Sequence, residues 1–198
     1  FAIRDKNDDL YRLTSQVRSL SDGYSDESWI KNIAKPLLDN LGKELIWPLA
    51  ISTFSGDSML VRETTDKTSP LALNRYTPGI RVPVLGSSSG RVYITFCEEN
   101  EREALLNLLK NSTEVANNIA RDKHLINKII LKIKNDGFTI MDDTINPEIS
   151  MAVPIFSEKK VIGAIVMRFI RSAVTTDQAI QRYIPLLKKA SEELESKL

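Results

Sequence analysis

Arg168 has the most unusual surroundings of any charged residue in the chain. It lies in the segment 161–170 (VIGAIVMRFI), in which both alternating sets of side chains are otherwise apolar. A strand that is apolar on both faces is usually covered on both sides, and a buried guanidinium needs an anionic or hydrogen-bonding partner. A protein carboxylate or the anionic group of a ligand could be this partner. Alternatively, Arg168 lies near enough to the strand end for its side chain to extend to water or to join a surface ion pair.

Residues 86–90 (GSSSG) form a second cluster that could bind a ligand. If they open a helix, the free N–H groups and the hydroxyls of Ser87, Ser88, Ser89 and Gly90 form an array of donors suited to a carboxylate. The simpler alternative is a serine N-cap that serves only the helix.

The same cluster also matches G-x-S-x-G, the nucleophile elbow of α/β-hydrolases, with Ser88 as the nucleophile. The base would have to be His124, the one histidine of the chain, which lies inside a predicted helix. The alternating strands and helices of such hydrolases are missing, so this function stays an alternative. A phosphate-binding P-loop is excluded, because three residues rather than four separate Gly86 from Gly90, and no Lys-Ser/Thr pair follows.

Few other residues are suited to chemistry. Arg75, shortly before Pro78, is either a second anion contact or a solvated strand residue. Cys97 and His124 are the single cysteine and single histidine, so an internal disulfide is impossible and a Cys/His metal site lacks ligands. We expect Cys97 to pack as a small buried apolar group, and we expect neither a metal nor a cofactor.

Composition suits one soluble domain. The chain has 198 residues, with 27 Lys and Arg against 26 Asp and Glu. A nucleic-acid-binding chain usually shows a basic excess, so this chain itself is not expected to bind DNA. No apolar run approaches the roughly 18 residues of a membrane helix and no signal peptide is visible, which predicts a cytoplasmic location. The chain begins with Phe1 rather than Met, which suggests a fragment of a longer protein.

Two helices are expected before the first strand. Leu10, Leu13, Val17 and Leu20 recur at spacings of three and four, which is typical of one face of an amphipathic helix. A second helix is expected to begin near Asp26 or Ser28. Its predicted buried side consists of Ile30, Ile33, Ala34, Leu37, Leu38 and Leu41. Pro36 within this pattern predicts a kink or a late helix start.

The pattern after position 47 predicts six strands and four helices. The strands are expected at 47–54, 58–63, 71–76, 138–141, 151–156 and 161–170. The helices are expected as a short one capped by the serines at 87–89, then at 99–110, at 123–135 and from about 176 to 198. Because strands come in consecutive groups rather than alternating with helices, the fold class is α+β with an antiparallel sheet.

Three segments together resemble the C-terminal effector-binding domain of IclR-type bacterial transcription regulators. Residues 76–91 (YTPGIRVPVLGSSSGR) resemble that family's G-x-x-x-P-L-H-x-x-A-x-G-K/R, with Leu85 in place of the histidine. Residues 134–138 (KNDGF) match its R-x-x-G-Y/F. Residues 151–165 match its A-A-P-V-F … V-x-A-A-L/I, and order and spacing agree from about Trp29 onward.

Three shorter segments narrow the resemblance to a subgroup. Residues 47–49, 62–65 and 74–76 resemble the MhpR-like regulators that activate catabolism of phenylpropionate-type aromatic acids.

The resemblance implies a GAF/PAS-like curved antiparallel sheet flanked by helices, with a small acid in a cleft. It implies that residues 1–24 are a linker helix from a missing N-terminal winged helix-turn-helix domain, and that residues 25–198 are the effector-binding domain. It further implies a regulator rather than an enzyme, which forms a homodimer or homotetramer and contacts DNA only through the missing domain.

By position in the family, the cleft is lined by Ser87–Ser89, the loop 142–149, Val166 and Arg168. Many members have a small or hydroxyl residue where Arg168 stands, which favours a carboxylate anchor here. We therefore expect a small, aromatic carboxylate with its charged end between Arg168 and the donors at 87–90. The complete set of expected effector contacts is Ser87, Ser88, Ser89, Gly90, Arg168, Val166, Leu71, Leu73, Arg75, Asp142, Asp143 and Pro154. The alternatives are a hydrolase using Ser88 and a ligand-free dimerisation module with Arg168 in an internal ion pair.

Overall fold

Two β-hairpins form the centre of the protein in a computed structural model that describes residues 2–4, 11–13, 28–143 and 145–198. The first joins β3 (Leu49–Ser55) to β4 (Ser58–Thr64), and the second joins β7 (Glu148–Ser157) to β8 (Lys160–Ile170). β3 also pairs with β8, so the two hairpins make one antiparallel sheet. Strands were expected from the sequence at all four of these positions, and they are confirmed.

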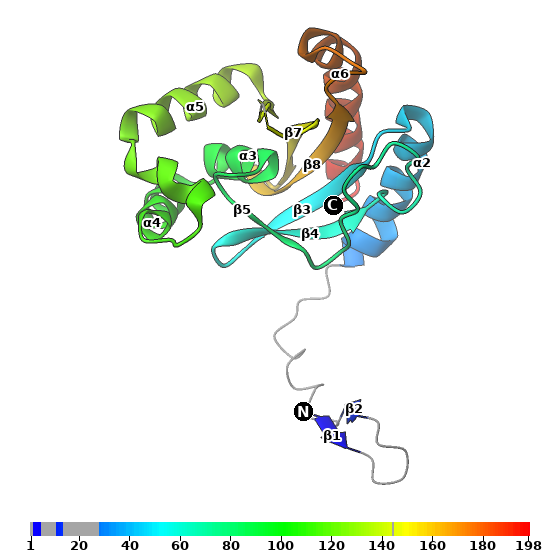
Figure 1. Ribbon diagram of the computed structural model, residues 1–198, viewed down its shortest axis with the longest axis horizontal. Coiled ribbons are helices and arrows are strands. Elements are labelled where there is room, and N and C mark those ends of the chain that lie inside the picture. Colours follow the sequence, from blue (N-terminus) through cyan, green and yellow to red (C-terminus); the bar gives the residue numbers. More distant parts are fainter. Residues whose placement is uncertain (1, 5–10, 14–27, 144) are drawn as a thin grey trace.

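Two short strands complete the sheet. β5 (Arg81–Pro83) pairs with β4 and β6 (Thr139–Met141) pairs with β7, which gives the order β5-β4-β3-β8-β7-β6. The register shifts between Ile51 and Ser52 and again between Ile155 and Phe156. An extra residue at such a bulge bends its strand and increases the local twist, so the sheet is curved. The α+β class with an antiparallel sheet is confirmed (Figure 1).

Helices α2 (Lys35–Leu45) and α6 (Thr176–Glu195) cover one face of the sheet, here called the α6 face (Figure 1). Thr175 and Gln178 form a capping box that fixes the start of α6. Pro36 lies in the first turn of α2, and the π-helical turn η1 (Ile30–Ala34) precedes it, so the irregularity predicted at Pro36 is present. The core on this face contains Leu38, Leu49, Ile51, Ile149, Met151, Ile165, Met167, Phe169 and Leu187.

The opposite face, here called the α3 face, is covered by α3 (Ser88–Phe96). Helices α4 (Glu99–Lys110) and α5 (Lys123–Asp136) lie beyond it, joined by the 3-10 helix η2 (Val115–Arg121) (Figure 1). The sheet presents small side chains to α3, because Ala50, Ala152 and Ala164 all belong to the cluster on this face. Small side chains let a helix pack close to a sheet.

Two sequence expectations are wrong in the described residues. Residues 71–76, expected as a strand, form an irregular loop, and the strand that pairs with β4 is β5 instead. Leu13, expected in a helix, lies in β2 (Tyr11–Leu13), which pairs with β1 (Ala2–Arg4). Leu10, Val17 and Leu20, the other residues of that predicted helix, lie outside the described residues. No helix in the described ranges is long and apolar enough to cross a membrane.

Candidate effector site

The N-terminus of α3 presents donors that the helix itself does not use. Ser87 is the N-cap, and its hydroxyl accepts a hydrogen bond from the Gly90 amide at 3.1 Å. The first amides of a helix have no acceptor within it, which leaves those of Ser88 and Ser89. Ser88 is 2% exposed, and its hydroxyl has no hydrogen-bond partner in the described part of the chain. This end of α3 is therefore suited to an anionic or hydrogen-bond-accepting group.

Gly90 explains how closely α3 packs. A Cβ atom at this position would lie 2.1 Å from the carbonyl oxygen of Val84, a backbone atom that cannot swing aside. Only glycine lets the first turn of α3 approach the chain that leads into it.

The packing of α3 shows which way its N-terminus points. Phe96, in the last turn, packs edge-on against Phe156, with ring centroids 5.6 Å apart. Val92, one turn earlier, lies in the same cluster as Ala164 and Val166 of β8. β8 begins opposite Phe156 and runs through Val166 towards Arg168. The N-terminus of α3 therefore points towards the Arg168 end of the sheet.

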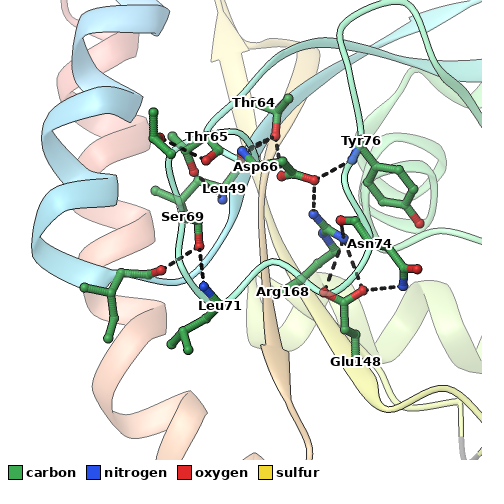
Figure 2. A network of polar contacts seen from close by, with 12 residues as sticks. Leu49, Thr64, Thr65, Asp66, Ser69, Leu71, Asn74, Tyr76, Glu148 and Arg168 are labelled. Carbon is green, nitrogen blue, oxygen red and sulfur yellow. Dashed lines mark hydrogen bonds and ion pairs between the residues drawn. The ribbon is translucent and has the colours of Figure 1, made fainter.

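Arg168 is buried and paired with two carboxylates. Its Nη2 donates to Asp66 Oδ2 in a short ion pair, and its Nη1 donates to Glu148 at 3.2 and 3.3 Å and to the Asn74 carbonyl at 3.0 Å (Figure 2). The ring of Tyr76 stacks on the guanidinium, with 4.3 Å between the guanidinium carbon and the ring centroid. The side chains of Arg168, Asp66 and Glu148 are 7%, 0% and 4% exposed.

This result decides between the partners that the sequence left open for Arg168. The partners of Arg168 are protein carboxylates, which agrees with the alternative that placed Arg168 in an internal ion pair. The alternative in which its side chain extends to water is wrong. The contact expected between Arg168 and an effector stays a prediction.

The Arg168 network fastens the loop 65–80 across the end of the sheet. Asp66 accepts hydrogen bonds from the Thr64 hydroxyl at 2.5 Å and from the Tyr76 amide at 2.6 Å. Asn74 donates its side-chain amide to Glu148 Oε2 at 2.7 Å. Ser69 donates to the Ile46 carbonyl at 2.7 Å on the other side of the loop (Figure 2). These tertiary hydrogen bonds explain why residues 71–76 are not a strand.

The structure gathers some of the expected contact residues and separates others. Val166 and Pro154 lie on the α3 face with Ser88 and Arg168, since they alternate with the buried residues of the α6 face. Leu71 instead packs against the core of the α6 face. Leu73 and Arg75 are exposed.

The two aspartates of the loop 142–149 serve a different arginine. Asp142 forms an ion pair with Arg171, and the Asp143 carbonyl accepts a hydrogen bond from the same side chain. Both aspartates are exposed, so the geometry does not bring them to Arg168.

The hydrolase alternative lacks its base. His124 is exposed at the start of α5, and Ser88 makes no hydrogen bond to it. Within the described ranges there is also no group of three or more His, Cys, Asp or Glu side chains that could hold a metal ion.

Cys97 behaves as the sequence predicted. It is buried at the end of α3, and burial raises the pKa of its thiol to about 11. Arg102 lies beside it and donates to the carbonyls of Ile94, Thr95 and Cys97. It thereby satisfies carbonyl groups at the C-terminal end of α3.

Sequence reasoning missed Asp66 and Glu148, the two carboxylates of the network. Asp66 stands in a run of polar residues after β4 that has no periodicity, and Glu148 is a single charge at the start of an otherwise uncharged strand. The one available signal was that a buried Arg168 needs an anionic partner. This signal does not identify which carboxylates of the chain are the partners.

A hollow of about 630 Å³ lies elsewhere, between α4 and α5. Its lining includes the apolar Leu106, Ile126 and Ile130, with Glu103, Lys123 and Lys134 around them. It shares no residue with the α3 N-terminus or the Arg168 network.

Comparison with solved structures gives the fold. An IclR homologue from Microbacterium hydrocarbonoxydans, solved in complex with 4-hydroxybenzoate, matches with a TM-score of 0.74 and 19% identity, over 100% of this chain and 79% of that one. IclR of Thermotoga maritima matches with a TM-score of 0.73 and 19% identity, over 100% and 79%. The PobR inducer-binding domain of Acinetobacter, a double mutant with 3-hydroxybenzoic acid, matches at 0.68 and 18% identity, over 84% and 98%. The curved sheet with its helices is thus the GAF/PAS-like fold expected from the sequence.

The family follows from the sequence match itself. The family model described as "Bacterial transcriptional regulator IclR C-terminal" matches residues 23–196, which is most of the chain. The chain therefore belongs to the IclR family of bacterial transcriptional regulators, as a C-terminal effector-binding domain.

Proposed function

We propose that this domain senses a small aromatic carboxylate and that the carboxylate binds at the N-terminus of α3. The observation that carries the proposal is the buried Ser88 hydroxyl, which has no partner in the described residues and lies beside helix amides that lack acceptors. A buried donor without a partner costs free energy, and a bound carboxylate would remove that cost. Two structures of similar fold were solved with hydroxybenzoates, which supports an aromatic acid as the effector class.

The body of the effector would lie on the α3 face. Val166 and Pro154 of β8 and β7 offer apolar surface there, and the side chain of Ser150, next to Arg168 across the strand pair, has no hydrogen-bond partner among the described residues. In this proposal an effector enters by displacing the loop 65–80, which the buried Arg168 network holds in place. This movement is the conformational difference that a sensor needs, because a ligand switches a protein only by binding one arrangement better than another.

We further propose how the domain acts in the whole regulator. Residues 1–24 would be the connection to a winged helix-turn-helix domain that contacts DNA, with the strands β1 and β2 in place of the helix expected there. The regulator would be a cytoplasmic homodimer or homotetramer of the MhpR-like subgroup that controls aromatic catabolism. The support for the subgroup is the resemblance of segments 47–49, 62–65 and 74–76.

The proposal is tested by thermal unfolding of the purified chain against a panel of small carboxylates that includes benzoate, phenylpropionate and their hydroxy derivatives. An acid present at about 100 times its dissociation constant should stabilise the chain by roughly 2.7 kcal/mol. Ser88→Ala should reduce that response. Ser191→Ala is the matched control, because Ser191 is also a buried serine but lies on the α6 side, where it donates to the Pro154 carbonyl.

A second candidate is a ligand-free dimerisation module, and one observation favours it. Arg168 is already in an internal ion pair, as that alternative requires. If no acid of the panel stabilises the chain, the sensor function is wrong and the module becomes the better account. If acids bind but Ser88→Ala responds like the wild type, the sensor stands and the assigned carboxylate position is wrong.

A further inference from the structure

We propose that Glu148 accepts a hydrogen bond from a donor group of the effector, so that the effector is an acid with a hydroxyl or amino group at the end away from its carboxylate. This inference rests on the proposed function, since it assumes that the carboxylate lies at the N-terminus of α3. Arg168 is then a positioning residue, which holds Glu148 and does not itself receive the carboxylate.

Glu148 has unused acceptor capacity. Its Oε2 accepts from Asn74 at 2.7 Å and from Arg168 at 3.2 Å, but from the described residues its Oε1 accepts only a long bond from Arg168 at 3.3 Å. An ionised carboxylate offers about four lone-pair positions. The side chain is 4% exposed, so bulk water does not fill them. Asp66 differs, because its two oxygens already accept from Thr64, Tyr76 and Arg168.

The charge of the network also favours a donor over an anion. Two carboxylates, those of Asp66 and Glu148, share the guanidinium of Arg168. Their other donors among the residues that the structure describes are neutral and come from Thr64, Asn74 and Tyr76. The buried cluster therefore carries one surplus negative charge. A third carboxylate at Arg168 would be repelled, whereas a hydroxyl or ammonium group would be attracted.

The spacing of the two polar ends fits a small ring. From Phe96 back to Ser88, α3 rises about 12 Å, while β8 advances about 23 Å from Val161, which pairs with Phe156, to Arg168. Measured from Phe96, the N-terminus of α3 stops about 11 Å short of Arg168 along the sheet. Measured from Val92, which lies in one cluster with Ala164 and Val166, it stops within about 7 Å. A single-ring acid with its donor opposite the carboxylate, hydrogen-bonded at both ends, can span such a gap.

The test compares pairs of acids that differ in one hydroxyl group. The pairs are benzoate with 4-hydroxybenzoate, and 3-phenylpropionate with 3-(4-hydroxyphenyl)propionate, titrated calorimetrically into the whole chain. A hydrogen bond to a charged acceptor predicts that the wild type binds the hydroxy acid about tenfold or more tightly than its partner. Glu148→Ala should remove this preference, and Glu148→Gln, which keeps the shape and one acceptor oxygen, should reduce it.

Asp66→Asn is the matched control, because it removes one negative charge from the same network without removing the spare acceptor. It should keep the hydroxyl preference. Equal binding of both acids of each pair by the wild type, or an unchanged preference in Glu148→Ala, would overturn the inference and leave the sensor function intact. Failure of every acid to bind a folded wild-type chain would instead refute the proposed function, and the inference with it.

Discussion

Replacement of Arg168 by methionine should destabilise the domain by about 3–5 kcal/mol. Methionine is unbranched and flexible enough to fill much of the space, but it donates no hydrogen bond. Asp66 would keep only its bonds from Thr64 and Tyr76, and Glu148 only its bond from Asn74. Both carboxylates are nearly inaccessible to water, at 0% and 4% exposure, so two buried charges would lose their counter-ion.

The assay is urea unfolding of the whole chain followed by circular dichroism. Such a loss is a large share of the 5–15 kcal/mol by which native proteins are stable, and for a domain of this size it lowers Tm by about 10 °C. Arg171→Met is the matched control. Arg171 also pairs with an aspartate, Asp142, but both side chains are about a third exposed, so that variant should lose at most about 1 kcal/mol.

A further variant isolates the cause. If uncompensated carboxylates are responsible, adding Asp66→Asn and Glu148→Gln to Arg168→Met should restore part of the lost free energy of unfolding. The reasoning is refuted if Arg168→Met costs no more than Arg171→Met, or if the triple variant is no more stable than Arg168→Met alone.

Three more predictions concern the ends of α3. Gly90→Ala should cost about 3 kcal/mol or more in urea unfolding, because the new methyl group meets the Val84 carbonyl at 2.1 Å. The comparison is Gly42→Ala at a half-buried helix position, where the added Cβ meets the Thr65 side chain at 3.1 Å and no backbone atom. A loss at Gly90 no larger than that at Gly42 would contradict the packing described for α3. Cys97 should resist maleimide at pH 8 in the folded chain and react only after unfolding, since burial raises the pKa of its thiol to about 11. Rapid maleimide labelling of the native chain would instead show that the thiol is accessible. The raised pKa of the thiol should also lower the free energy of unfolding as the pH rises from about 9 towards 11, because the thiol of the unfolded chain loses its proton first.

The sequence determined the elements whose causes are local. The turn residues Ser55-Gly56-Asp57 place the first hairpin, and Gly56 adopts the positive φ of 71° that the turn requires. The helix expected at 99–110 has those bounds in the structure. The helix expected at 123–135 ends at Asp136, and Gly137 is its C-cap in a left-handed conformation, which glycine adopts without strain. The serine cap of α3 likewise depends on residues three positions apart.

Tertiary structure decided the partners of Arg168 and the course of the loop 65–80. The sequence showed that a buried guanidinium needs an anion, but Asp66 is 102 residues away along the chain and Glu148 is 20 away. Residues 71–76 look like a strand locally, yet hydrogen bonds from Asn74 and Tyr76 to the network hold them as a loop. Periodicity reports only which face of an element is apolar, whereas the pairing of buried charges depends on which distant segments the fold brings together.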